Sequence, residues 1–289
     1  MRWPTQQNFH DLYKMSLQIA SLNSGSNGNA YYIGNQSGAV LVDAGISCKE
    51  TEKRMLGLGL NIQKLKAIFI SHEHTDHIKG LSVLAAKYCL PVYISKGTYE
   101  KSRLNLDSTQ LQWLSASQPV NIDGLIIKAF GKKHDAQDPY SFTINNNEVT
   151  IGVFTDIGAA CDNVIHHFKT CHAAFLESNY DEEMLENGRY PYVLKKRIRG
   201  GYGHLSNKQA LEIFVKHRPS FMSHLLLSHL SRDNNDPQLV QQLFEQHAQQ
   251  TKIVVASRYE ASELFHIRNV QVTAAPPVFA RPTQMNLFA

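Results

Sequence analysis

Cysteine is scarce in this 289-residue sequence, and no two cysteines stand close together. The four that occur, Cys48, Cys89, Cys161 and Cys171, form no CxxC pair, so neither a zinc knuckle nor a disulfide framework is indicated. No segment approaches the roughly 18 uninterrupted apolar residues of a membrane span, and the N-terminus lacks the apolar core of a signal peptide. These absences predict a soluble, cytoplasmic protein without a membrane partner.

A strong charge of either sign is missing as well. Lys and Arg number 29 against 25 Asp and Glu, and the net charge of +4 permits an anionic partner without demanding one. What the sequence does have is a hydrophobic content of 43%, enough for one sizeable core in a chain of this length. We therefore expect one main globular unit.

Short β-rich runs alternate with segments of helical periodicity along most of the chain. Strands are expected at 17–22, 30–35, 39–45, 67–71, 91–95, 125–130, 140–145, 148–154, 173–178, 223–228 and 251–257. Helices are expected at 48–60, 78–89, 182–188, 207–217 and 237–250. Many strands interleaved with helices, in two similar halves, predict an α/β (α+β) fold of sheets covered outside by helices.

The stretch ISHEHTDHIKG at 70–80 holds four potential metal ligands within six positions: His72, His74, Asp76 and His77. It follows the apolar run AIFI, and residues two apart on extended backbone project to one side, so His72 and His74 should converge. Asp76 and His77 follow as the chain turns into the next helix. A polar loop with coincidental histidines would explain any one of them, but the full HxHxDH pattern favours two adjacent metal sites.

The HxHxDH pattern, after a strand and before a helix, resembles the signature of the metallo-β-lactamase superfamily. Its members build a four-layer αββα sandwich with metals at one edge, and the resemblance implies that fold here. It also implies three further ligands near strand ends, which are His134, Asp156 and His229. In the superfamily pattern one metal is held by His72, His74 and His134, the other by Asp76, His77 and His229, and both by the bridging Asp156.

The expected ligands are imidazoles and carboxylates without a thiolate. Such a set suits zinc, manganese or iron, so two divalent cations are predicted and their element stays open.

A finer resemblance, over roughly residues 15 to 265, is to the YycJ/WalJ-type branch of bacterial exonucleases. It rests on SLNSGSNGNA at 21–30, KKHDAQDPYSF at 132–142, the segment 176–198, GHLSN at 203–207 and LSHLSRDNN at 227–235. The resemblance implies a 5′-to-3′ DNA exonuclease domain at 15–270 without an inserted β-CASP domain, preceded by an extension at 1–14. The chain departs from the branch at Tyr180, where histidine is expected, so we assign no catalytic role there.

The chemistry expected of such a centre is phosphodiester hydrolysis, with the cations activating water and stabilising charge on phosphate oxygens. Asp76 belongs to that catalytic centre. Protonation of the leaving 3′ oxygen suits a histidine. His204 is the candidate, because its loop resembles a histidine loop in phosphodiesterases of this fold, where the histidine is paired with a glutamate that matches Glu177.

Several further residues could contact the substrate. Small residues of two loops could approach phosphate, and basic residues of LKKRIRGG could follow a nucleic-acid backbone. The loop candidates are Ser24, Ser26, Asn27, Ser206 and Asn207, and the basic candidates are Lys195 and Arg197 with their neighbours Lys196 and Arg199. Ordinary turns and a solvated helix face explain the same residues equally well.

The C-terminal residues 271–289 are punctuated by proline and lack periodicity, which predicts an extended tail. Gln284, Leu287 and Phe288 resemble the QxxLF peptide that binds the bacterial sliding clamp, with the apolar pair in a groove and the amide at its rim. This resemblance implies a clamp partner, DNA rather than RNA as substrate, a place at the nucleoid, and a role in repair such as mismatch repair. Alternatively, Leu287 and Phe288 fold back on the domain.

Three other functions stay open at this point. One is hydrolysis of a small ester, lactam or thioester, as elsewhere in the superfamily, and another is RNA processing. The third is a clamp-bound adaptor without catalysis, against which the complete ligand set argues.

Overall fold

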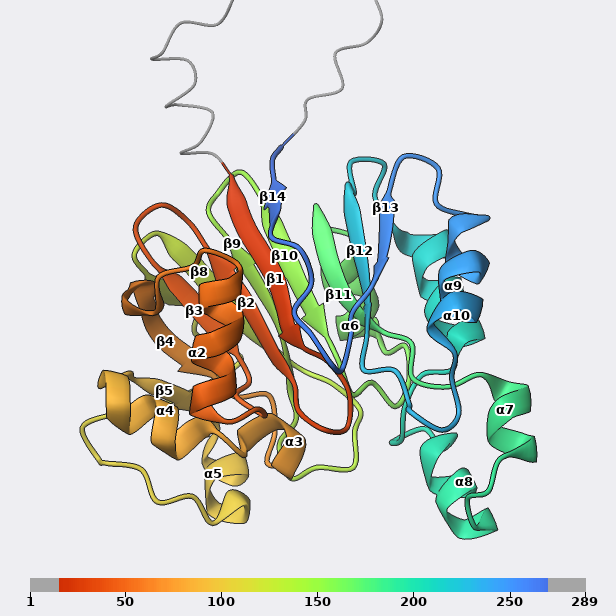
Figure 1. Ribbon diagram of the computed structural model, residues 1–289, viewed down its shortest axis with the longest axis horizontal. Helices are drawn as coiled ribbons and strands as arrows, with labels where there is room; N and C mark the ends of the chain where they lie inside the picture. Colours follow the sequence, from red (N-terminus) through yellow and green to blue (C-terminus); the bar gives the residue numbers. More distant parts are fainter. Residues whose placement is uncertain (1–15, 270–289) are drawn as a thin grey trace, which may run out of the picture.

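The structure, a computed structural model, describes residues 16–269. Two seven-stranded sheets pack face to face, and helices cover the outer face of each (Figure 1). The strand order is β14-β1-β2-β3-β4-β5-β6 in the first sheet and β13-β12-β11-β10-β9-β8-β7 in the second. This arrangement is the four-layer αββα sandwich that the sequence predicted.

The first sheet, which we call sheet A, begins as an antiparallel meander and continues as parallel strands. Its strands are β1 (Leu17–Asn23), β2 (Ala30–Gly34), β3 (Ala39–Val42), β4 (Leu65–Phe69), β5 (Val92–Ile94), β6 (Leu111–Trp113) and β14 (Phe265–Ile267). From β3 to β6 all pairings are parallel, so each connection must cross over. The crossovers carry α2 (Cys48–Gly57), η1 (Ile62–Lys64), α3 (Thr75–Ile78), α4 (Leu81–Tyr88) and α5 (Lys96–Ser102).

The second sheet, sheet B, follows the same plan. Its strands are β7 (Val120–Ile122), β8 (Leu125–Gly131), β9 (Tyr140–Asn145), β10 (Thr150–Phe154), β11 (Ala173–Glu177), β12 (His224–Ser228) and β13 (Lys252–Val255). Strands β7 to β10 pair antiparallel and β10 to β13 pair parallel. Its helices are α6 (Asp162–Phe168), α7 (Glu182–Asn187), α8 (Tyr192–Ile198), α9 (Asn207–His217) and α10 (Pro237–Glu245).

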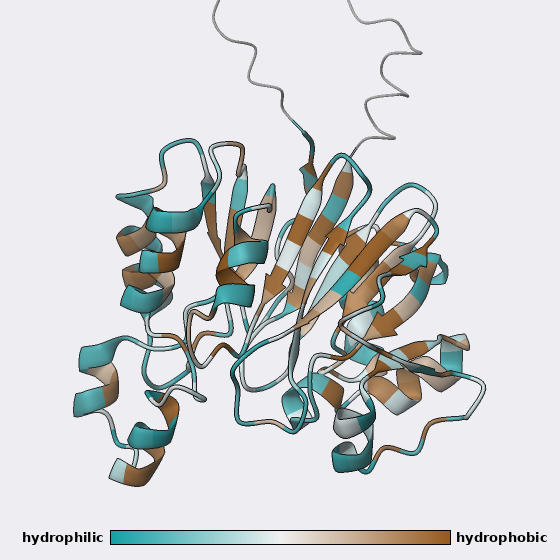
Figure 2. Ribbon diagram, turned by 180° about the vertical axis from the view of Figure 1, so that it is seen from behind, coloured by the Kyte–Doolittle hydropathy of each residue, from teal (hydrophilic) through white to brown (hydrophobic). Residues whose placement is uncertain are grey.

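The core consists of three apolar layers, one between the sheets and one under each set of helices. Between the sheets, the ring of Tyr31 on β2 packs against Phe175 on β11 with centroids 4.9 Å apart. Central strands are buried on both faces, so they read as continuous apolar runs and not as alternating patterns. Figure 2 shows these brown strands between helices that are teal on their outer sides.

The strands that carry the predicted ligands end at one edge of the sandwich, the lower edge in Figure 1. Strands β3 and β4 of sheet A are parallel, and so are β10, β11 and β12 of sheet B. Parallel strands have their carboxyl ends at the same edge, and ligands of α/β folds bind there. The fold therefore gathers residues that are far apart in the sequence.

The main correction to the predicted elements concerns the helix expected at 78–89. It begins later, as α4 at Leu81, because the chain turns at Gly80 after the separate short helix α3, which ends at Ile78. The Gly80 N–H donates to Ala44 O at 2.8 Å, and a Cβ at Gly80 would meet Ile46 O at 1.8 Å. Close passage of the β3–α2 loop thus requires glycine at this position. The helices expected at 48–60 and 237–250 also end earlier, at Gly57 and Glu245.

The elements that the sequence did not predict are short ones: η1, α3, β6, β7, β14, α5, α6 and α8. Within residues 16–269, no helix is long and apolar enough to cross a membrane.

Candidate metal centre

The HxHxDH stretch leaves β4 as an extended segment and then enters α3. Ser71 fixes its start, since Ser71 N–H donates to Asp43 Oδ1 at 2.8 Å and its hydroxyl donates to Asp43 Oδ2 at 2.9 Å. His74 lies at the N-cap of α3, and Asp76 and His77 lie in its single turn. This change from strand to helix directs all four candidate ligands toward sheet B.

Three imidazoles converge on one point of the edge. His72 Nε2 lies 3.0 Å from His74 Nδ1, and His134 Nε2 lies 3.3 Å from the same atom. His134 Nδ1 donates to Gly203 O at 3.1 Å, which leaves the lone pair of its Nε2 facing the other two rings. The ligand atoms of the three histidines all lie within 4.8 Å of one another, close enough to share one cation.

A second set lies beside the first. His77 Nδ1 is 2.7 Å from Asp43 Oδ2, and His229 Nδ1 is 3.0 Å from Glu177 Oε1, so the carboxylates hold both rings by their Nδ1–H. His229 Nε2 then faces Asp76 Oδ2 at 3.3 Å. A neutral imidazole nitrogen and a carboxylate oxygen are both acceptors, and a proton or a cation between them makes this approach favourable.

Asp156 connects the two sets. Its Oδ2 lies 3.1 Å from His77 Nε2, and its Oδ1 lies 3.7 Å from His134 Nε2. Within the described residues, this Oδ2 is buried and has no hydrogen-bond donor. An orphaned carboxylate oxygen among imidazole lone pairs fits the bridging position between two cations. The clustered histidines and aspartates thus suit a dinuclear metal site; they leave its element open.

Backbone geometry at three strand ends turns side chains into the centre. Asp43 after β3, Asp156 after β10 and His229 after β12 have φ angles of 64°, 54° and 55°. Left-handed backbone is uncommon outside glycine, although Asp and His tolerate it better than bulky residues. Asp43 was not predicted from the sequence, but an aspartate at the end of a buried strand, as at Asp156, is the signal that could have found it.

Glu177, at the end of β11, accepts hydrogen bonds from several residues in a buried network. Its Oε1 accepts from His204 Nδ1 at 2.7 Å and from His229 Nδ1 at 3.0 Å, and its Oε2 accepts from Ile157 N–H at 2.7 Å. The pair of His204 and Glu177 that the sequence suggested is therefore in contact. The His204 side chain is 19% exposed, while Glu177 is fully buried, so the imidazole can reach a substrate and the carboxylate cannot.

Electrostatics within this network are set by burial and by opposite charges. Burial alone would raise the pKa of Glu177, but the charge of His204 and hydrogen bonds from His204 and His229 lower it to about 2. Burial opposes charge on His229, yet Asp156, Asp76 and Glu177 raise its pKa to about 10. Protons and cations compete for the same nitrogens, so metal binding at this site releases protons.

Comparison with known proteins settles the family. A model of the β-lactamase superfamily domain matches residues 39–229. The chain belongs to the metallo-β-lactamase superfamily. Among solved structures, the metallo-β-lactamase fold protein YhfI of Bacillus subtilis has a TM-score of 0.69 at 17% identity, covering 88% of this chain and all of that one, which shows the shared fold.

Curated relatives narrow the family to one branch. Exodeoxyribonuclease YycJ of Bacillus anthracis is 36% identical over 249 residues, which cover 85% of this chain and 94% of that protein. Exodeoxyribonuclease WalJ of Streptococcus pneumoniae is 31% identical over 231 residues, covering 78% of this chain and 86% of that protein. The chain is a member of the YycJ/WalJ-type branch, as its motifs predicted.

Residues around the candidate ligands hold them in place. Asn179 Nδ2 donates to His229 O at 2.7 Å, and Asn29 Nδ2 lies 3.2 Å from both Asp76 Oδ2 and His77 Nε2. Lys132 is buried and donates to Thr155 O at 2.6 Å, and burial lowers its pKa. None of the three was predicted, because a lone Asn or Lys carries no spacing signal.

The candidate phosphate contacts differ in exposure. Ser206 and Asn207 are buried, and their side chains have partners inside the protein, so their contacts are those of structural residues. Ser206 Oγ caps α9 by accepting from Gln209 N–H at 3.2 Å, and Asn207 Oδ1 accepts from the Ser178 hydroxyl at 2.7 Å. The assignment of these two to phosphate is therefore disfavoured by their hydrogen bonds.

The loop between β1 and β2 supports the centre directly. Ser24 is buried, and its Oγ accepts from His229 N–H at 2.7 Å, so it positions the candidate ligand His229 and is not at the surface. Ser26 and Asn27 are exposed on the same loop, and Asn27 Nδ2 donates to Arg258 O at 2.9 Å. Of the three loop candidates, only these two have side chains at the surface.

The basic residues lie on α8, in an arm formed by α7 and α8 that projects from the edge of the sandwich (Figure 1). Arg197 Nε donates to Asp135 Oδ2 at 2.5 Å, beside His134, and Lys195 Nζ donates to Glu186 O. In the sequence, α7 and α8 lie between Glu177 and His204, so the two ends of this arm are next to the centre. The tail residues Gln284, Leu287 and Phe288 lie outside the described residues.

Proposed function

We propose that this protein is a dinuclear metal-dependent exodeoxyribonuclease that degrades DNA from the 5′ end. The observation that carries the proposal is the single cluster of five imidazoles and two carboxylates, adjoined by the His204–Glu177 pair, in a chain 36% identical to an exodeoxyribonuclease. The relatives' names support DNA as the substrate, and the 5′-to-3′ direction rests on the resemblance of motifs.

The proposed ligand sets follow the two groups of side chains. His72, His74 and His134 would hold the first cation, Asp76, His77 and His229 would hold the second, and Asp156 lies where it could serve both. Two bound divalent cations supply a water molecule of lowered pKa and neutralise charge that develops on phosphate oxygens. The chain's part is to fix the ligands, which Asp43 and Glu177 do by accepting from the rings of His77 and His229.

His204 is the proposed general acid for the leaving 3′ oxygen. Glu177 holds its Nδ1, which leaves Nε2 to deliver a proton on the open side of the centre. The buried carboxylate cannot contact the substrate, so Glu177 acts as a positioning residue for His204 and His229 together. Exposed cations of α8, with Lys196 among them, are proposed to contact the DNA backbone.

The proposal is tested by digesting DNA labelled at the 5′ or 3′ end, single- and double-stranded, with manganese or zinc. We expect the wild-type protein to release the 5′ label first, and Asp76→Ala to lose nearly all activity while its thermal unfolding midpoint with chelator stays near that of the wild type. An RNA of the same sequence and a small thioester serve as parallel substrates. Faster hydrolysis of the RNA or of the thioester than of DNA would contradict the exodeoxyribonuclease assignment.

A role in DNA repair, with recruitment by the sliding clamp, is the finer part of the proposal and depends on the tail sequence alone. Leu287→Ala with Phe288→Ala should abolish binding to purified clamp and leave nuclease activity on free DNA unchanged. Mismatch repair in cells should fail in Asp76→Ala and weaken in the tail variant. Normal repair with Asp76→Ala would instead favour the adaptor function.

A further inference from the structure

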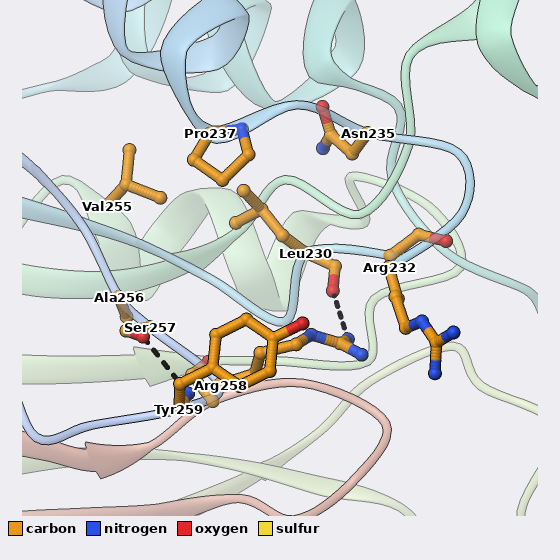
Figure 3. A pocket seen from close by; sticks show the side chains of 11 residues that line it. Leu230, Arg232, Asn235, Pro237, Val255, Ala256, Ser257, Arg258 and Tyr259 are labelled. Atoms are coloured by element: carbon orange, nitrogen blue, oxygen red, sulfur yellow. Dashed lines mark hydrogen bonds between the residues drawn. The ribbon is translucent and has the colours of Figure 1, made fainter.

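A pocket of about 230 Å³ lies beside the metal centre, between the loop after β12, the N-terminus of α10 and the segment after β13 (Figure 3). Two residues of the centre's own framework line it. Leu230 directly follows His229, and Ser24 accepts the His229 N–H. A molecule in this pocket would therefore lie next to the strand end that carries His229.

The floor of the pocket is apolar and its rim carries an exposed aromatic ring. Leu230, Pro237, Val255 and Ala256 are the apolar residues that line it, and we call them its apolar floor. Tyr259 stands at the rim and is 77% exposed, an unusual state for a large ring. An apolar floor with an exposed ring fits a flat heteroaromatic group, because bases stack on aromatic side chains in a sequence-tolerant way.

Two guanidinium groups add a site for an anion. Arg258 is partly buried, packs against Gly25, and donates from Nη2 to Leu230 O at 2.9 Å. Among the described residues, no hydrogen bond engages its Nε or Nη1, so donors remain for a ligand. The Arg232 side chain is 71% exposed, and its ion-pair partner within residues 16–269 is the neighbouring Asp233, at 3.7 Å. Guanidinium donors with this freedom suit phosphate oxygens.

We propose that this pocket receives the 5′-terminal nucleotide of a DNA strand, with its base against the apolar floor and Tyr259 and its 5′-phosphate against Arg232 and Arg258. The inference rests on the proposed nuclease function. It adds an explanation of how the enzyme would select the 5′ end of a strand. Leu230 and Ser24 place the pocket next to the strand end that carries His229, so in this proposal the phosphodiester bond after the bound nucleotide is the one presented to the metal centre.

The test uses four substrates: a 5′-phosphorylated single strand, the same strand with an abasic 5′ residue, the same strand with a 5′-hydroxyl, and methyl 4-nitrophenyl phosphate. For the wild type, loss of the base or of the phosphate should each lower kcat/KM by about tenfold, the size of one stacked base or one charged hydrogen bond. Tyr259→Ala should abolish the discrimination against the abasic end only. Arg232→Gln should abolish the discrimination against the 5′-hydroxyl end only.

Lys128→Gln is the matched control, since Lys128 is an exposed cation on β8 away from the pocket, and its ratios should equal those of the wild type. Binding of the three strands is also measured by fluorescence anisotropy in the Asp76→Ala background, where no cleavage interferes. Wild-type ratios in both pocket variants, in kinetics and in binding, would overturn the proposal. A wild type that cleaves none of the four substrates would sink the nuclease function instead, and the binding ratios would still decide on the pocket.

Discussion

Asp43 accepts a hydrogen bond from the ring of His77, and replacing Asp43 tests how much this contact contributes to metal affinity. Asn tolerates the φ angle of 64° at this position, so Asp43→Asn keeps the backbone and removes the charge that holds the imidazole. We expect metal affinity to fall by about 10- to 100-fold, measured by competition with a chromogenic chelator. Asp123→Asn, at an exposed turn with φ 48°, is the control and should bind metal normally.

His204 can be separated from the ligands because it should act on the leaving group and not on metal binding. We expect His204→Asn to lower kcat on DNA by about 10²- to 10⁴-fold, the usual worth of general acid catalysis. The decrease in kcat should be much smaller on a 4-nitrophenyl phosphodiester, because the 4-nitrophenolate leaving group needs no proton. Metal content should equal that of the wild type and of the exposed-site control His166→Asn. An equal loss on both substrates would contradict the acid role.

At the scale of elements, the N-terminus of α9 allows a test of whether Ser206 caps the helix or contacts phosphate. Ser206 forms a capping box with Gln209, so Ser206→Ala should cost about 1 kcal/mol of unfolding free energy, as N-cap losses do. Denaturant unfolding would measure this, with Ser47→Ala at the N-cap of α2 as the matched case. KM for DNA should not change. A raised KM at unchanged stability would instead restore the phosphate contact that the sequence suggested.

Helix α8 offers a second test at this scale, because its exposed cations lie in the arm next to the centre. Lys196→Gln should weaken DNA binding similarly for all sequences and lower the salt dependence, the slope of log K against log salt, by about 1. Lys169→Gln on the C-cap of α6 removes the same charge elsewhere and should leave the slope as it is. Equal slopes in both variants would show that α8 does not follow the phosphates.

Long apolar or periodic segments made the main elements predictable, and contacts distant in sequence explain what was missed. Runs such as AVLV and HLLLS can only be buried strands, and each was found in its place. Strand β6 has three residues with a half-exposed pattern, so only its pairing with β5 defines it. The HxHxDH spacing predicts its candidate ligands locally, whereas Asp43 and Asn179 matter only because the fold brings them to His77 and His229.

The whole metal-free protein should be most stable near pH 6.5, since its imidazoles are shifted in both directions. Burial lowers the pKa of His134 and His167 from 6.5 to about 4, so the unfolded chain binds more protons below pH 6.5 and stability falls there. The pKa of His229, held down by burial but raised by Asp156, Asp76 and Glu177, reaches about 10. The folded state therefore binds the extra proton above pH 6.5, and stability falls again as pH rises.

Thermal unfolding with chelator, from about pH 5 to 8, would measure this maximum. His229→Asn should reduce the decline on the alkaline side and leave the part that comes from His77, whose pKa is held down by burial but raised well above 6.5 by Asp156, Asp43 and Asp76. Bound metal should remove both parts because cations replace the protons. A midpoint that rises steadily from pH 6.5 to 8 in the chelated wild type would contradict the prediction.

Both proposed ligand sets draw on the two halves of the sandwich, and this has a consequence for how the protein matures. Sheet A contributes the four residues of the HxHxDH stretch, while His134, Asp156 and His229 come from sheet B. As the chain leaves the ribosome, His229 is the last of the seven to be synthesised, so a nascent chain has an incomplete set for most of its synthesis. Full occupancy of the proposed centre must then wait until the second half has been synthesised and folded, so an unfinished chain would lack the proposed nuclease activity.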